Sequence, residues 1–152
     1  MRISREKMFM DMAHLAAQRA TCQRLNVGAL IVRGNRIVSL GYNGTEPGAD
    51  HCAGETCEGW NTGCSLTIHA EDNAIRYIPE GITSNSLELY CTDSPCQNCW
   101  ELIKKDGRIC RVYFRTVYRL TDHLREPHPI ELFRVLPSGT VIDWRQNKTI
   151  KP

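Results

Sequence analysis

The chain has 152 residues, the size of one ordinary domain, and its 19 Lys and Arg against 17 Asp and Glu give a net charge of +2. No basic run is longer than a pair, which argues against a nucleic-acid surface. No long apolar run occurs and charges interrupt the N-terminal segment, so we expect no signal peptide or membrane span and a soluble, cytoplasmic protein. Eight cysteines in such a chain favour metal ligation over disulfides.

Apolar spacing predicts the first elements. Met8, Met12, Leu15 and Ala16 recur at helical spacing, so we expect an amphipathic helix from Ser4 to about Cys22. Two β-rich runs around the turn "RGN" then predict an antiparallel hairpin. These runs are Val27–Val32 and Arg36–Leu40.

The segment at 45–68 shows no periodicity and is rich in Gly, Asp, Glu, Cys and Thr, which predicts a long irregular insertion. Helices and strands alternate after it. We expect a short helix at "HAEDNAIRYI", a strand at "LELYCTD", a helix at "CQNCWELIKKDG", a strand at "ICRVYFRT", a helix over Leu124–Leu136 and a last strand at "GTVIDW". This order predicts a single α/β domain over residues 1–152, with helices on both faces of a central mixed sheet of about five strands.

His69, Cys96 and Cys99 form the strongest chemical signal. Each lies at or near a predicted helix start after a loop, where the helix dipole favours thiolates. Three protein ligands leave a fourth zinc position open for water, as catalytic zinc sites do, whereas structural sites have four ligands. Glu71 lies two residues after His69 and is placed to act over that open position. The spacing matches the His-x-Glu and Pro-Cys-x-x-Cys signature of zinc deaminases, in which the glutamate transfers protons.

These residues have other interpretations when each is taken alone. A lone Cys-x-x-Cys pair is also found in redox sites and in halves of structural zinc sites, and a single histidine is more often an ordinary polar residue than a ligand. Together they favour a hydrolytic centre, because zinc with three ligands lowers the pKa of a water towards neutrality and a carboxylate can take its proton.

The motifs "VGALIV", "RIVSLGYNG", "IHAEDNAI" and "TDSPCQNC" resemble those of the deoxycytidylate deaminase family, within the cytidine deaminase-like superfamily, over about residues 4 to 120. The resemblance implies a three-layer α/β/α fold and hydrolysis of dCMP to dUMP, which supplies the precursor of dTMP. It also implies activation by dCTP, inhibition by dTTP, Mg²⁺ accompanying the effector nucleotide, and a homohexamer without nucleic-acid or membrane partners.

The same resemblance implies a role for individual residues around the catalytic zinc. The backbone amide of Ala70 would bind the pyrimidine O2, and the carbonyl of Ser94 would receive the departing amine. Asn43 would bind the deoxyribose 3′-hydroxyl, and Tyr118 would contact the phosphate.

Effector nucleotides would bind near Tyr42, Asn43 and Gly44 against a neighbouring subunit. The alternative interpretation of "GYNG" is a turn at the end of a strand, in which Gly and Asn supply unusual backbone angles.

One position departs from the family pattern. Some members carry a phosphate-binding arginine nine residues after the catalytic glutamate, where this chain has Glu80. A carboxylate cannot replace a bidentate cation on a phosphate. Either Arg76, Arg115 or Arg119 supplies the charge, or the preference for monophosphate over triphosphate is relaxed.

Four further cysteines suggest a second, structural zinc, which members of the family often bind. The predicted ligands are Cys22, Cys52, Cys57 and Cys64, with His51 as the substitute for one thiolate. An irregular segment that lacks apolar periodicity has few other ways to offset its ordering entropy.

The alternatives differ in what they require. Deamination of dCTP, or of both nucleotides, needs the same metal centre with a different phosphate site. A tRNA or nucleic-acid editing deaminase should show a basic, aromatic-rich track, which the charge pattern does not support. A zinc-braced interaction module would use the same ligands without needing the carboxylate of Glu71.

Overall fold

A computed structural model of the chain describes residues 1–52, 54, 57, 59 and 64–152. Within them, seven strands form one sheet in the order β2-β1-β3-β4-β5-β6-β7, more than the five or so expected. The strands are β1 (Gly28–Arg33), β2 (Arg36–Tyr42), β3 (Leu87–Asp93), β4 (Ile109–Thr116), β5 (Glu131–Val135), β6 (Val141–Asp143) and β7 (Lys148–Lys151). The central strands β3, β4 and β5 run parallel and the other neighbours antiparallel, so the sheet is mixed, as predicted.

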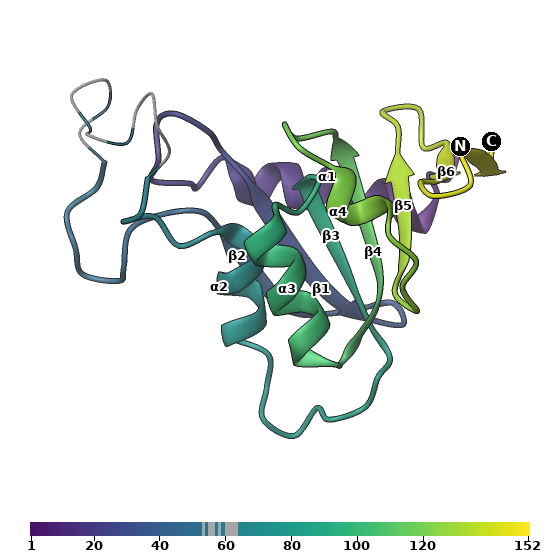
Figure 1. Cartoon of the computed structure of the whole chain (residues 1–152), viewed down its shortest axis with the longest axis horizontal. Helices are drawn as coiled ribbons and strands as arrows, with labels where there is room; N and C mark the ends of the chain where they lie inside the picture. Colours follow the sequence, from purple (N-terminus) through teal and green to yellow (C-terminus); the bar gives the residue numbers. More distant parts are fainter. Residues whose placement is uncertain (53, 55–56, 58, 60–63) are drawn as a thin grey trace.

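Helices cover both faces of the sheet, which confirms the three-layer arrangement (Figure 1). Helix α1 (Arg5–Ala17) lies on one face, and α2 (Ala70–Arg76), α3 (Gln97–Asp106) and α4 (Asp122–Arg125) lie on the other. Both faces of strand β1 are buried, which explains why its sequence is almost entirely apolar. Ala29 and Ile31 belong to the core under α2 and α3, whereas Leu30 and Val32 pack towards α1.

Helix α1 begins where the sequence predicts, because the Ser4 hydroxyl accepts a hydrogen bond from the backbone N–H of Lys7 at 3.2 Å. Its buried face differs from the predicted stripe. Leu15 is 63% exposed, and the buried apolar positions of this helix are Phe9, Met10, Ala13, Ala16 and Ala17. The alanines allow the helix to pack closely on the sheet.

The predicted helix over Leu124–Leu136 is wrong. Within that range only Leu124 and Arg125, the last two residues of α4, are helical, and β5 follows. Pro127 restricts the residue before it, and Glu126 is extended, with φ −62° and ψ 140°. The predicted last strand is present as β6, and the C-terminal residues add β7, which the sequence did not indicate.

The functional side of the sheet is the end at which β3 and β4 finish. The segments after β2 and β3 enter α2 and α3 there, with His69 and Cys96 as the two N-cap residues. Glycines permit this arrangement. A Cβ on Gly41 would collide with the backbone of α2, because it would overlap the carbonyl oxygen of Ala70 and lie 2.6 Å from the backbone nitrogen of Ala74. None of the described helices is long and apolar enough to cross a membrane.

Candidate functional site

His69, Cys96 and Cys99 come together as predicted. The ligand atoms of the three residues lie within 4.8 Å of one another. His69 Nδ1 lies 3.2 Å from Cys99 Sγ and 3.6 Å from Cys96 Sγ. Tetrahedral zinc, with bonds of about 2.0 Å to nitrogen and about 2.3 Å to sulfur, separates such donor atoms by about 3.5 Å. One imidazole and two thiols at these distances therefore fit a zinc ion.

The electrostatics of the thiols follow from their contacts and from the start of α3. Hydrogen bonds from Cys99 and from His69 lower the pKa of Cys96 to about 4. The contact with Cys96 raises the pKa of His69 in turn, because the thiolate stabilises the imidazolium. The contact with Cys96 and burial raise the pKa of Cys99. One thiolate is thus favoured even before a cation is added, which is the state a metal requires.

Glu71 lies beside this cluster without being part of it. Its side chain is buried at the start of α2, and its Oε2 accepts a hydrogen bond from Cys99 Sγ at 3.6 Å. Burial raises the pKa of Glu71 to about 7. A carboxyl group whose pKa lies near neutrality can both accept and donate a proton, as general acid and base catalysis requires.

A pocket of about 90 Å³ opens in front of Glu71. Its wall contains all four residues predicted to touch a substrate. The lining residues are Cys22, Arg24, Leu25, Val27, Asn43, Cys64, Thr67, His69, Ala70, Glu71, Asp93, Ser94, Cys96 and Tyr118. Segments from before β1, after β2, after β3 and after β4 therefore meet at one end of the sheet.

Hydrogen bonds hold the polar residues of the pocket in place. Asn43 is buried, its Oδ1 accepts from the N–H of Val27 at 2.8 Å, and its Nδ2 donates to the carbonyl of Leu25 at 2.6 Å. The Ser94 hydroxyl accepts from the N–H of Tyr118 at 2.7 Å. The side chain of Ser94 therefore positions Tyr118, and both residues line the pocket.

The "GYNG" segment joins the pocket to the metal cluster. The backbones of Gly44 and Ile68 exchange two hydrogen bonds, at 2.8 and 3.1 Å, directly before His69. The carbonyl of Tyr42 accepts from Asn73 of α2 at 2.9 Å. Asn43 lines the pocket but Tyr42 and Gly44 do not, so the structure separates the predicted effector residues into two environments.

The arginines considered for the phosphate are not among the residues that line the pocket. Arg76 pairs with Asp72 and Glu46, Arg115 pairs with Asp11, and Arg119 lies over the ring of Tyr118. The exposed Glu80 follows α2 and is not among the lining residues.

Arg24, which the sequence reasoning missed, is half-buried in the pocket wall. No motif singles it out. Its one signal is its place in the short segment between the first helix and the first strand.

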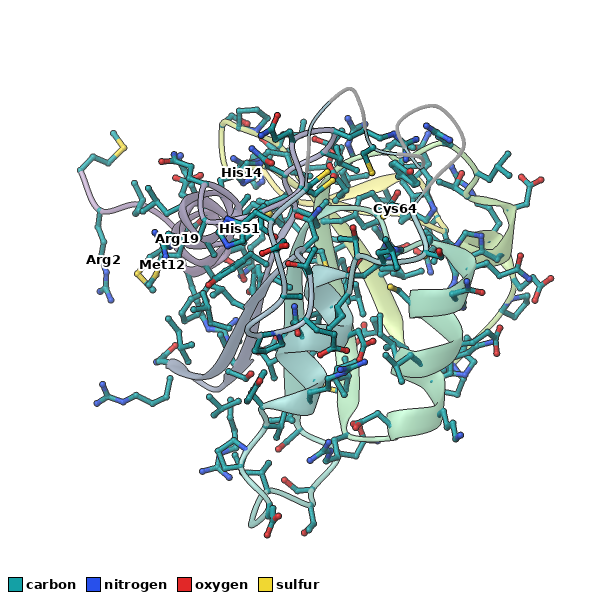
Figure 2. All side chains as sticks on the ribbon, turned by 90° about the vertical axis from the view of Figure 1, so that its left-hand side faces the viewer. Arg2, Met12, His14, Arg19, His51 and Cys64 are labelled. Atoms are coloured by element: carbon teal, nitrogen blue, oxygen red, sulfur yellow. The ribbon has the colours of Figure 1, made fainter. Side chains whose placement is uncertain are left out.

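Asp93, at the end of β3, is a second lining residue that the sequence reasoning missed. Its Oδ2 is buried and has no hydrogen-bond partner in the described part of the chain. Burial raises the pKa of Asp93, and the imidazole of His14, labelled in Figure 2, opposes that rise.

The cysteines of the predicted second site are only partly gathered. The Cys57 thiol is in hydrogen-bonding contact with Cys52 and with Cys64, while Cys22 and Cys64 both line the pocket. His51 lies on the side of α1 and Cys64 on the side of α3 (Figure 2). The predicted insertion at 45–68 includes residues 53, 55–56, 58 and 60–63, which are outside the described residues.

Comparisons with known proteins agree with this geometry. A family model described as the cytidine and deoxycytidylate deaminase zinc-binding region matches residues 3–116. ComE operon protein 2 of Bacillus subtilis is 42% identical over 133 residues, which cover 87% of this chain and 67% of the relative. Deoxycytidylate deaminase of Schizosaccharomyces pombe is 38% identical over 130 residues. This chain spans 40% of that relative and 44% of the Saccharomyces cerevisiae deoxycytidylate deaminase.

A solved structure matches the chain over almost its own whole length. The dCMP deaminase of cyanophage S-TIM5 in complex with dCMP and dUMP superimposes with a TM-score of 0.74 at 31% identity, over 88% of this chain and 98% of the phage protein. Taken with the match over residues 3–116 and the zinc-compatible cluster, these similarities show that the chain belongs to the family of cytidine and deoxycytidylate deaminases.

Proposed function

We propose that this chain hydrolyses dCMP to dUMP and ammonia. The observation that carries the proposal is the position of a buried carboxyl group, Glu71, beside a zinc-compatible cluster and in the wall of a pocket that contains the residues predicted to bind the nucleotide. The similar cyanophage protein, of nearly the same length, binds dCMP and dUMP.

His69, Cys96 and Cys99 would hold the zinc ion, which supplies an activated water when it is bound. Glu71 takes a first proton from the attacking water and delivers it to the ring nitrogen. It then takes the remaining proton of the hydroxyl that the water has formed on C4 and delivers it to the amine, which leaves as ammonia while the C4 carbonyl of dUMP forms. The amide of Ala70, at the start of α2, binds the pyrimidine O2, and the carbonyl of Ser94 receives the amine. Burial of Glu71 keeps these transfers away from bulk water.

We assign the phosphate to Arg24 and Tyr118. Both line the pocket, and Arg24 is the guanidinium among the lining residues. Arg76 and Arg115 are engaged by carboxylates. Arg119, which lies 5.6 Å from the ring centre of Tyr118, steadies that ring rather than contacting the phosphate. An arginine placed in this way compensates for Glu80.

We also propose the second zinc, held by Cys22, Cys52, Cys57 and Cys64. The contacts of Cys57 with Cys52 and Cys64 support it, and His51 stays the predicted substitute for one thiolate. Metal analysis should then find two zinc ions per chain, and Cys57→Ser should reduce this to one. One zinc per chain in the unmodified protein would contradict the second site.

We carry over the regulation that the family resemblance implies, with dCTP as activator, dTTP as inhibitor, Mg²⁺ accompanying the nucleotide, and a homohexamer. Support comes from the pairing of Gly44 with Ile68, which connects the predicted effector segment to His69 by one residue. Rate measurements with dCTP and Mg²⁺, together with the mass of the assembly by light scattering, test this proposal. A monomer indifferent to dCTP and dTTP would refute it.

The central test is direct. Zinc-loaded protein incubated with dCMP and dCTP should release ammonia and form dUMP. Deamination of cytidine, dCTP or RNA without deamination of dCMP would refute the assignment.

A further inference from the structure

Asp93 is the acidic residue of the pocket to which the proposed chemistry gives no task. It ends β3 and lines the pocket together with Glu71 and Asn43. Its Oδ2 is buried and, within the described residues, has no hydrogen-bond partner. A buried carboxylate oxygen without a partner reduces the stability of the protein. A group on a bound ligand that donates a hydrogen bond would satisfy it.

The strand register places Val27 between Asp93, at the end of β3, and Asn43, directly after β2, because β1 lies between these two strands. Ala29 of β1 lies opposite Cys91 of β3, and the N–H of Gly28 donates to the Thr92 hydroxyl at 3.2 Å. One step further along both strands brings Asp93 next to Val27. The N–H of Val27 is the group that donates to Asn43 Oδ1. The carboxylate and the amide therefore flank the same end of the pocket.

Asn43 can donate a hydrogen bond to a sugar hydroxyl but cannot accept the proton of that hydroxyl. Asn43 Oδ1 already accepts from Val27, and one of the two Nδ2 protons is donated to Leu25. The other N–H has no acceptor among the described residues and is available to a ligand. A hydroxyl bound by that N–H accepts a hydrogen bond through its oxygen. Its own proton still needs an acceptor, and Asp93, which lines the same pocket from the other side of Val27, offers a carboxylate oxygen that has no partner among the described residues.

The substrate has few protons to offer. dCMP carries only the 4-amino group and the 3′-hydroxyl as hydrogen-bond donors when its phosphate is fully ionised. The amino group is directed to the carbonyl of Ser94 in the proposed reaction. We propose that Asp93 accepts the proton of the sugar 3′-hydroxyl and so selects nucleotides that carry this group. This inference rests on the proposed deamination of dCMP.

The test compares dCMP with 2′,3′-dideoxycytidine 5′-monophosphate, which lacks only the 3′-hydroxyl. A hydrogen bond to an ionised acceptor changes binding by a factor of about 10 to 100, so the unmodified enzyme should lose about that factor in kcat/KM on the dideoxy substrate. Asp93→Leu should lose about the same factor on dCMP, mainly through KM, and should then discriminate much less between the two substrates, keeping only the part that the N–H of Asn43 contributes. Asp93→Asn, with a neutral acceptor, should lie between. Asp122→Asn, an exposed acid on α4, is the matched control and should discriminate like the unmodified enzyme.

Stability separates a binding role from a structural one. Because Asp93 Oδ2 has no partner within the described chain, neither Asp93 variant should lower Tm, whereas a structural role predicts a lower Tm. Equal losses on both substrates in the Asp93 variants would overturn the inference while leaving deamination of dCMP intact. Absence of dUMP formation by the unmodified, zinc-loaded enzyme would overturn both proposals.

Discussion

Glu71 is the residue whose removal best separates an enzyme from a zinc-braced interaction module. Glu71→Gln keeps the size of the side chain but removes the group that transfers protons, so we expect kcat on dCMP to fall by about 10² to 10⁴. Zinc content should be unchanged, because the ligand atoms belong to His69, Cys96 and Cys99. Ammonia release and metal analysis of the same preparation measure both effects. Full activity of the variant would contradict the mechanism.

Arg24 makes a second prediction at the scale of the residue. Arg24→Ala should raise KM for dCMP by about 10- to 100-fold, because charge-assisted hydrogen bonds to phosphate are lost. The rate on deoxycytidine, which has no phosphate, should not change. Arg76→Ala is the matched control, since Arg76 is exposed and paired with Asp72, and it should leave both substrates unaffected. If Arg76→Ala raised KM for dCMP alone and Arg24→Ala did not, the phosphate would have to be assigned to Arg76 in place of Arg24.

The two groups of site residues differ in how visible they are in the sequence. His69, Glu71, Cys96 and Cys99 can be predicted because metal ligation demands particular residue types at short, helix-compatible spacings. Arg24 and Asp93 obey no such spacing. Each reaches the pocket because β1 begins at the edge of the sheet where the antiparallel β3 ends, which is a consequence of strand register.

At the scale of the element, the approach of α2 to the sheet decides where Glu71 lies. Gly41→Ala places a Cβ against the backbone of α2, 2.6 Å from Ala74 N and closer still to Ala70 O. Because backbone cannot move aside as a flexible side chain can, we expect a loss of about 1–3 kcal/mol of unfolding free energy and reduced activity. Denaturant unfolding and dCMP turnover measure the two effects.

Gly81→Ala is the matched control, since a Cβ at that position meets no atom within 4 Å. It should leave both unfolding free energy and turnover unchanged. Equal stability of the two alanine variants would show that α2 is not held by close contact at Gly41.

The elements themselves were predicted where local signals were strong. The hairpin, β3, α3 with its closing Gly107 at φ 78°, and β4 follow the expected order. The failure at Leu124–Leu136 arose because apolar residues in a run with two prolines also suit a short helix followed by an extended strand. Strand β7 was not predicted, because its residues are all exposed and it pairs only at the edge of the sheet, so it lacks the alternating apolar pattern of a buried strand.

At the scale of the whole molecule, one ion pair joins the two ends of the chain. Lys151 Nζ of β7 lies 2.5 Å from Glu6 Oε1 of α1. Burial raises the pKa of Glu6, but the hydrogen bond and charge of Lys151 outweigh it, so the pKa lies below its ordinary value. The other oxygen, Oε2, has no hydrogen-bond partner among the described residues. Lys151 is therefore the main compensation for a carboxylate that is only 5% exposed.

Lys151→Met should lower the unfolding free energy by about 1 kcal/mol at pH 7. This value is at the low end of the cost of leaving a buried polar group unpaired, because Lys151 itself is partly exposed to solvent. A carboxyl group whose pKa is lowered by folding stabilises the protein above its unfolded pKa of about 4.3, and this stabilisation is lost as the pH falls through the folded pKa. The difference between Lys151→Met and the unmodified protein should therefore shrink in acid. Urea unfolding at pH 7 and at about pH 3 measures it. Lys148→Met is the matched control, because Lys148 is an exposed lysine of the same strand and has no ion pair among the described residues. Its unfolding free energy should differ little from that of the unmodified protein at either pH. An equal loss of unfolding free energy in both variants would mean that the ion pair with Glu6 does not hold β7.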